Sequence, residues 1–92
     1  MYVVAQHRIK DPEKFFSTTP QDVAENAPPG VQGRQFYPGQ DRISAVCLWE
    51  GDSIDAVRDY VDSATGESSE NTYFEVNTEY AMGLPEAAAA SA

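Results

Sequence analysis

Hydrophobic residues occur along the chain in four short runs rich in β-branched and aromatic side chains, a pattern typical of β-strands. The predicted strands span residues 2–9, 31–37, 42–50 and 72–78. Successive strand residues face opposite sides of a sheet. In the third run one side carries Cys47 and Trp49, while the other carries Val46 and Leu48. Because a strand that is apolar on both sides is covered on both sides, we predict that this strand is central, and the first run has the same character.

The predicted helices lie between the first and second strands and between the third and fourth. Asp11-Pro12 and Thr19-Pro20 each combine a capping side chain with proline, which predicts two short helices at 12–18 and 20–26. A longer helix is predicted after Ser53, because apolar residues then recur at helical spacing on one side, at Ile54, Val57, Val61 and Ala64. Gly66 is a typical residue to end it.

The element order is β-α-β-β-α-β, which in a chain of 92 residues predicts an α+β domain of the ferredoxin-like, split-βαβ type. Its antiparallel sheet would have the strand order 4-1-3-2, with the helices on one face. We predict one domain over 1–85, followed by an Ala-rich disordered tail at 86–92. For the C-terminal segment 79–92 as a whole, the sequence leaves open an arm across a dimer or disorder.

The other face of the sheet is expected to carry an apolar set: Ile43, Ala45, Cys47 and Trp49. An open apolar patch of that size is unusual on a monomer. We therefore predict a homodimer in which two sheets pair face to face and enclose a cavity. The alternative is a monomer whose C-terminal segment covers this face.

Composition limits the partners. Six basic against fifteen acidic residues give a net charge of −9, which argues against nucleic acid and anionic membranes as partners. There is no run of about 18 apolar residues to span a membrane and no recognisable signal peptide. A single cysteine excludes an internal disulfide and fits a reducing compartment. We therefore expect a cytoplasmic protein.

The layout resembles the dimeric α+β barrel superfamily. The resemblance rests on three stretches: VVAQHRIKDPEKFF, AVCLWEGDSIDAVRDYV and YFEVNTEYA. Members of that superfamily include cofactor-independent monooxygenases of antibiotic biosynthesis, proteins like muconolactone isomerase, and small nickel-binding domains. The resemblance implies the fold and the dimer. It carries over no catalytic residue, since no subfamily motif matches, and fold does not determine function.

His7 is the sole histidine and therefore the candidate acid/base group, because its side chain titrates near neutral pH. A structural histidine on the rim is the alternative. Antiparallel pairing is expected to place His7 near residues 42–44, with Cys47 about 13 Å further along the strand. We therefore predict that Cys47 is a small buried apolar residue that does not form a site with His7.

The candidate ligand-binding residues combine one basic and three aromatic side chains: Arg34, Tyr37, Trp49 and Tyr73. Arg34 can bind an anionic group or pair with a surface acid, and the aromatic residues suit a flat organic ligand or the core. Glu50 is a further candidate base at a strand end, although such a residue is more often solvated. Zinc and phosphate-loop motifs are absent, so we predict no metal ligands and no cofactor.

These observations leave open whether the domain is an enzyme. The leading hypothesis is that a homodimer binds a small organic molecule in a cavity, either between the two sheets or between the sheet and the helices of one copy. The first alternative is a cofactor-independent monooxygenase or isomerase that uses His7 as acid/base. The second is a nickel-type metal-binding accessory protein, and the third is a structural dimer module without a ligand.

Overall fold

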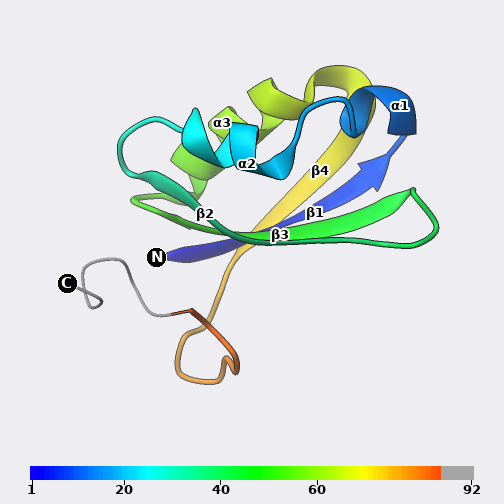
Figure 1. The fold of residues 1–92 in the computed structure, drawn as a ribbon. Helices are drawn as coiled ribbons and strands as arrows, with labels where there is room; N and C mark the ends of the chain where they lie inside the picture. Colours follow the sequence, from blue (N-terminus) through cyan, green and yellow to red (C-terminus); the bar gives the residue numbers. More distant parts are fainter. Residues whose placement is uncertain (86–92) are drawn as a thin grey trace.

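The computed structural model describes residues 1–85, so the predicted tail at 86–92 lies outside the described residues. The elements in chain order are β1 (Tyr2–Ile9), α1 (Pro12–Phe15), α2 (Pro20–Glu25), β2 (Val31–Pro38), β3 (Ser44–Gly51), α3 (Ile54–Thr65), the 3₁₀ turn η1 (Gly66–Ser68) and β4 (Ser69–Glu75). The strands form an antiparallel sheet in the order β2-β3-β1-β4. This is the predicted order read from the opposite edge. The helices lie together on one face of the sheet (Figure 1).

Side-chain caps set where the helices begin. The carboxylate of Asp11 accepts a hydrogen bond from the backbone N–H of Lys14 at 3.2 Å, and the Thr19 hydroxyl accepts one from Asp22 at 3.1 Å. Both caps are followed by proline, as predicted. The Ser53 hydroxyl caps α3 through the Ala56 N–H at 3.0 Å. The first helix is shorter than predicted and ends at Phe15.

The core lies between the sheet and α3. Cys47 and Trp49 point to this side and pack in one cluster with Val57 and Val61 of α3. The prediction that these two β3 residues lie on the uncovered face is therefore wrong, and Ala45 belongs to the same helix-facing side. The fourth residue of that set, Ile43, precedes β3 and is 54% exposed. Both sides of β3 are apolar, so alternation alone did not distinguish the covered side.

Two strand boundaries differ from the prediction. β3 begins at Ser44 rather than at 42, because a carboxylate oxygen of Asp41 accepts hydrogen bonds from the N–H groups of Ile43 and Ser44, both at 3.0 Å. Arg42 takes a positive φ of 64° in this turn. β4 begins at Ser69 rather than at 72, and Ser69 pairs with Ile9. Polar residues thus form the first part of β4.

The sheet face away from the helices carries exposed aromatic residues, with Tyr37 at 59% and Phe74 at 48%. Residues 76–85 continue from β4 on this side of the sheet (Figure 1). The Tyr2 hydroxyl donates a hydrogen bond to the Pro85 carbonyl at 2.8 Å and holds the end of this segment. Within residues 1–85, no helix is long and apolar enough to cross a membrane.

Candidate functional site

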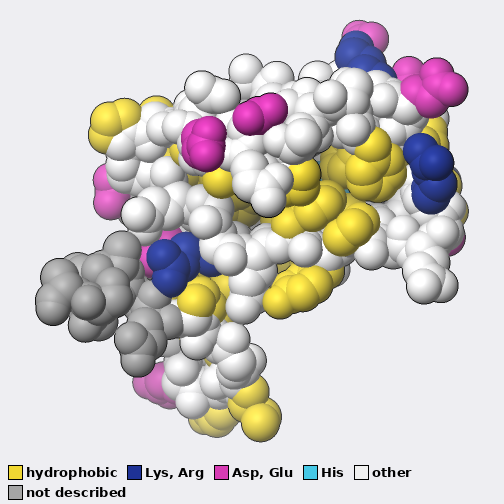
Figure 2. Space-filling view, viewed as in Figure 1, with side chains coloured by type: hydrophobic (Ala, Val, Ile, Leu, Met, Phe, Trp, Pro, Cys, Tyr) yellow, Lys and Arg dark blue, Asp and Glu magenta, His cyan; other side chains and the backbone are white. Residues whose placement is uncertain are grey.

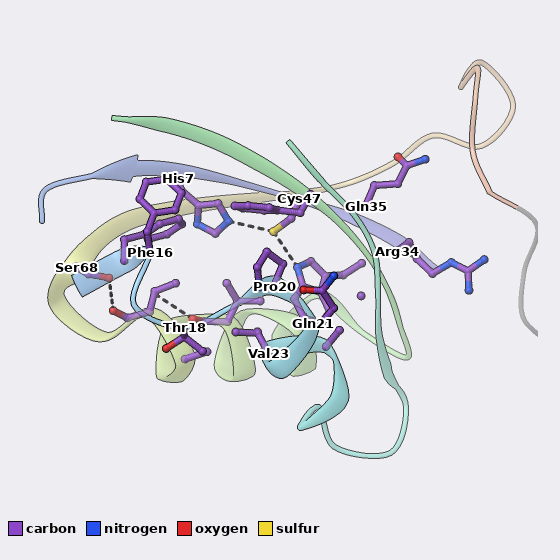
Figure 3. A pocket seen from close by; sticks show the side chains of 18 of the residues that line it. His7, Phe16, Thr18, Pro20, Gln21, Val23, Arg34, Gln35, Cys47 and Ser68 are labelled. Atoms are coloured by element: carbon purple, nitrogen blue, oxygen red, sulfur yellow. Dashed lines mark hydrogen bonds between the residues drawn. The ribbon is translucent and has the colours of Figure 1, made fainter. Parts of the chain in front are cut away.

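A cavity of about 280 Å³ lies between the sheet and the α1–α2 pair. Four aromatic side chains contribute to its lining: Phe15, Phe16, Phe36 and Trp49. Figure 2 shows hydrophobic side chains gathered in the seam between the helical layer and the sheet. Two side chains with chemical reactivity, His7 and Cys47, also line it (Figure 3). The cavity is thus largely apolar, with one reactive pair.

The space exists because the helical layer is interrupted. Thr19-Pro20 ends one short helix and begins the next, and neither α1 nor α2 contains a fully buried residue. On the sheet side, Gly33 has no side chain, and a Cβ there would lie 3.3 Å from the Ala24 Cβ. The Tyr60 hydroxyl of α3 donates a hydrogen bond to the Val23 carbonyl and holds α2 over the cavity.

His7 and Cys47 are in direct contact, with His7 Nε2 at 3.0 Å from Cys47 Sγ. The predicted separation of about 13 Å is therefore wrong. In the observed register His7 pairs with Ala45, so Cys47 is its diagonal neighbour on the same side of the sheet. Cys47 is buried as predicted, at 7% exposure. Its sulfur also accepts a hydrogen bond from Trp49 Nε1 at 2.9 Å.

Asn71 is the third member of this group. It pairs with His7 across β1 and β4, and its Oδ1 lies 2.7 Å from His7 Nδ1. Its Nδ2 donates to Asp62 Oδ1 and to Thr65 Oγ1, each at 2.9 Å. A carboxylate only accepts hydrogen bonds, so Asp62 fixes the orientation of the Asn71 amide.

This orientation determines the tautomer of His7. Because the Asn71 oxygen faces Nδ1, that nitrogen carries the proton, and Nε2 presents a lone pair to Cys47. The Phe15 ring packs against the imidazole, with centroids 5.4 Å apart, and covers its face. The arrangement therefore places the lone pair of His7 Nε2 within hydrogen-bond distance of the Cys47 thiol.

Burial keeps both groups neutral. It lowers the pKa of His7 below 6.5, although the Asn71 hydrogen bond and the Asp62 charge oppose this shift. Burial also raises the pKa of the Cys47 thiol to about 11, against the opposing effect of the Trp49 hydrogen bond. Near neutral pH the pair is therefore a protonated thiol donating to a neutral imidazole, because desolvation disfavours the charged forms.

The structure separates the four residues predicted to bind a ligand. Trp49 lines the cavity. Arg34 borders it, but Figure 3 shows its side chain pointing away, and its Nε lies 3.9 Å from a carboxylate oxygen of Glu50. Tyr37 pairs with Val46 in the hairpin and belongs to the sheet face away from the helices. Tyr73 faces α3 and donates a hydrogen bond to Asp62 at 2.5 Å.

Four residues of the site were not predicted from the sequence: Asn71 and the phenylalanines of the cavity wall, Phe15, Phe16 and Phe36. Asn71 lies in the stretch TGESSEN, which has the composition of a loop but contributes the first residues of β4. Phe15 and Phe16 adjoin each other beside the helix break, and Phe36 pairs with Cys47 in the β2–β3 hairpin. Alternation along β2 could have placed Phe36 on the same side of the sheet as Cys47, but the register that makes the two residues neighbours comes from the structure.

Among residues 1–85, no three side chains of His, Cys, Asp or Glu are grouped closely enough to hold a metal ion. Comparison with models of protein families, with curated proteins and with solved structures finds no match to this chain.

Proposed function

We propose that this domain binds a small, largely apolar organic molecule in the cavity between the sheet and the α1–α2 pair. The observation that carries the proposal is an aromatic-lined space that contains a few polar groups in defined positions, the usual composition of a ligand site. Its volume of about 280 Å³ is just below the usual range of roughly 300–1,000 Å³ for such sites, which favours a small ligand of one or two rings.

The proposed site corresponds to one of the two positions that the sequence hypothesis left open. It lies inside one copy of the chain, between helices and sheet, rather than between the sheets of two copies. His7 is common to both hypotheses, since it lines this cavity. The metal-binding hypothesis has no grouped ligands to support it within residues 1–85.

Trp49 provides the test, because it is the sole tryptophan and forms part of the cavity wall. We expect 4-phenylbutan-2-one, a one-ring ketone, to change its fluorescence in a saturable way at one molecule per chain. A dissociation constant of roughly 10 μM to 1 mM is expected for a ligand of this size.

The Ala24→Phe substitution should block this binding, because Ala24 lines the cavity beside Gly33. Ser63→Phe is the matched control, since Ser63 is an exposed residue of α3, and it should leave the dissociation constant unchanged. Unsaturable fluorescence in the wild type, or equal affinity in both variants, would contradict the proposal.

We also propose that two copies pair through the sheet face away from the helices, as in dimeric α+β barrels. The exposed Tyr37 and Phe74 support this arrangement, together with the half-buried Val4 and Val46 of the two central strands. Aromatic side chains are enriched at protein interfaces. The alternative is that residues 76–85, which lie on the same side of the sheet, cover this face in a monomer.

Native mass spectrometry at micromolar concentration tests the pairing, and we expect twice the chain mass. Phe74→Lys should convert the dimer to a monomer, because it places a charge within the apolar contact. Gln40→Lys adds the same charge in the exposed hairpin turn and should leave the protein dimeric. A wild-type monomer would refute the dimer and leave residues 76–85 as the cover of this face.

A further inference from the structure

The geometry points to Cys47 as a nucleophile that bonds covalently to an electrophilic ligand in this cavity, with His7 as its general base and Asn71 as the residue that positions His7. The inference rests on the proposed function, because the ligand must first bind in the cavity. It adds a reaction and a ligand class: small apolar molecules with a carbon–carbon double bond conjugated to a carbonyl group.

The hydrogen bonds around the thiol support this assignment. The thiolate is the reactive form of cysteine, and the Cys47 sulfur lies 3.0 Å from a basic nitrogen whose lone pair faces it. A base within hydrogen-bond reach and a third group that orients the base are the geometric signs of an activated nucleophile. His7 and Asn71 fill these two positions, from β1 and β4.

The surroundings of the sulfur favour the same role. The Trp49 N–H donates to it at 2.9 Å, which stabilises negative charge as it develops. Cys47 lines the cavity together with the aromatic rings, so a bound apolar ligand lies against the sulfur. A conjugated carbonyl compound suits this site because its electrophilic carbon belongs to its apolar part.

The reaction balances without a further reactant. As the Cys47 sulfur bonds to the β-carbon, Nε2 of His7 takes the thiol proton, and the π electrons of the double bond move toward the carbonyl to form an enolate. The imidazolium then returns the proton to the α-carbon. A carbon–sulfur bond and a carbon–hydrogen bond form, while the S–H bond and the π bond break. The product is a thioether.

The groups that face His7 determine the pH dependence of this step. They are Cys47 from β3, Asn71 from β4 and Phe15 from α1, while Asp62 of α3 acts through its charge. Lys14 of α1 lines the same cavity. The lowered pKa of His7 keeps it unprotonated above about pH 6.5. The rate of the base-assisted addition should therefore rise with pH to a plateau at about pH 6.5 and stay constant to about pH 8.5.

The experiment uses 4-phenylbut-3-en-2-one as the electrophile. Because Cys47 is the sole cysteine, intact-mass measurement over time reports the addition, and Cys47→Ser should abolish it. His7→Gln should lower the rate at pH 7 roughly 10²-fold. It should also replace the plateau by a tenfold rise per pH unit, as expected for a thiol that reacts only when ionised. If His7→Gln does not fold, the pH dependence of the wild-type addition rate tests the role of His7, because a plateau requires a base with a pKa below that of the thiol.

A matched compound separates the two proposals. 4-Phenylbutan-2-one has the same ring and ketone but lacks the double bond. If it binds saturably while the unsaturated ketone adds no faster than to free glutathione, the nucleophile is refuted and ligand binding stands. If neither compound binds, both proposals fail. Addition at a rate independent of His7, with no plateau in the pH profile, also overturns the inference.

Discussion

The Trp49→Ala variant should lose roughly 3–5 kcal/mol of unfolding free energy, the usual cost of truncating a large buried aromatic residue. Trp49 is 5% exposed and packs edge-on against Tyr60 with ring centroids 5.8 Å apart. Its removal enlarges an existing cavity and deprives the Cys47 sulfur of a donor. Urea denaturation followed by circular dichroism measures the loss, because the variant has no tryptophan fluorescence.

Tyr80→Ala is the matched control for this prediction. It also truncates an aromatic residue, but Tyr80 is 81% exposed and lies outside the strands and the proposed sheet-to-sheet contact. We expect its cost in an isolated chain to stay below about 1 kcal/mol, in line with substitutions at exposed positions. Equal losses in the two variants would contradict the assignment of Trp49 to the core.

Asn71→Leu is expected to lower the unfolding free energy by about 2–3 kcal/mol, although leucine has a similar size. The amide of Asn71 forms hydrogen bonds with His7, Asp62 and Thr65 and accepts a further one from Ser69 at 2.7 Å. The substitution leaves His7 Nδ1 without its partner in a buried position, and an unpaired buried polar group is costly. Thermal and urea unfolding measure the effect.

The neighbouring residue gives the control. Thr72 lies on the opposite side of β4, is exposed, and contacts Gln6 Oε1 at 3.3 Å. Thr72→Val should therefore change the unfolding free energy by no more than about 0.5 kcal/mol. If Asn71→Leu proves as mild as this, the hydrogen bonds of Asn71 do not stabilise the fold.

The sequence predicted the fold well because its strongest signals are local. Proline after a capping residue placed the starts of both short helices, and the spacing of Val57 and Val61 identified the buried side of α3. The doubly apolar character of the first and third runs indicated the two central strands, and the sheet order confirms this. These features depend on neighbours within a few residues.

The candidate site was harder to predict because it depends on register between distant strands. An Asx turn at Asp41 delays the start of β3, so pairing counted from position 42 misplaced His7 relative to Cys47. An error of this kind converts direct contact into an apparent separation of several residues. Asn71 was missed because a polar, loop-like composition also occurs where side chains form a hydrogen-bond network.

The helical segment between β1 and β2 is divided into two short helices, α1 and α2, and this division affects how quickly a ligand would enter and leave the cavity. Segments with little buried surface open locally at a free energy below that of global unfolding, and α1 and α2 contain no fully buried residue. We therefore expect the proposed ligand to exchange through brief detachment of these two helices, while α3 and the sheet remain folded. The residence time of such a ligand would then depend on the local stability of α1 and α2 and not on the stability of the whole domain.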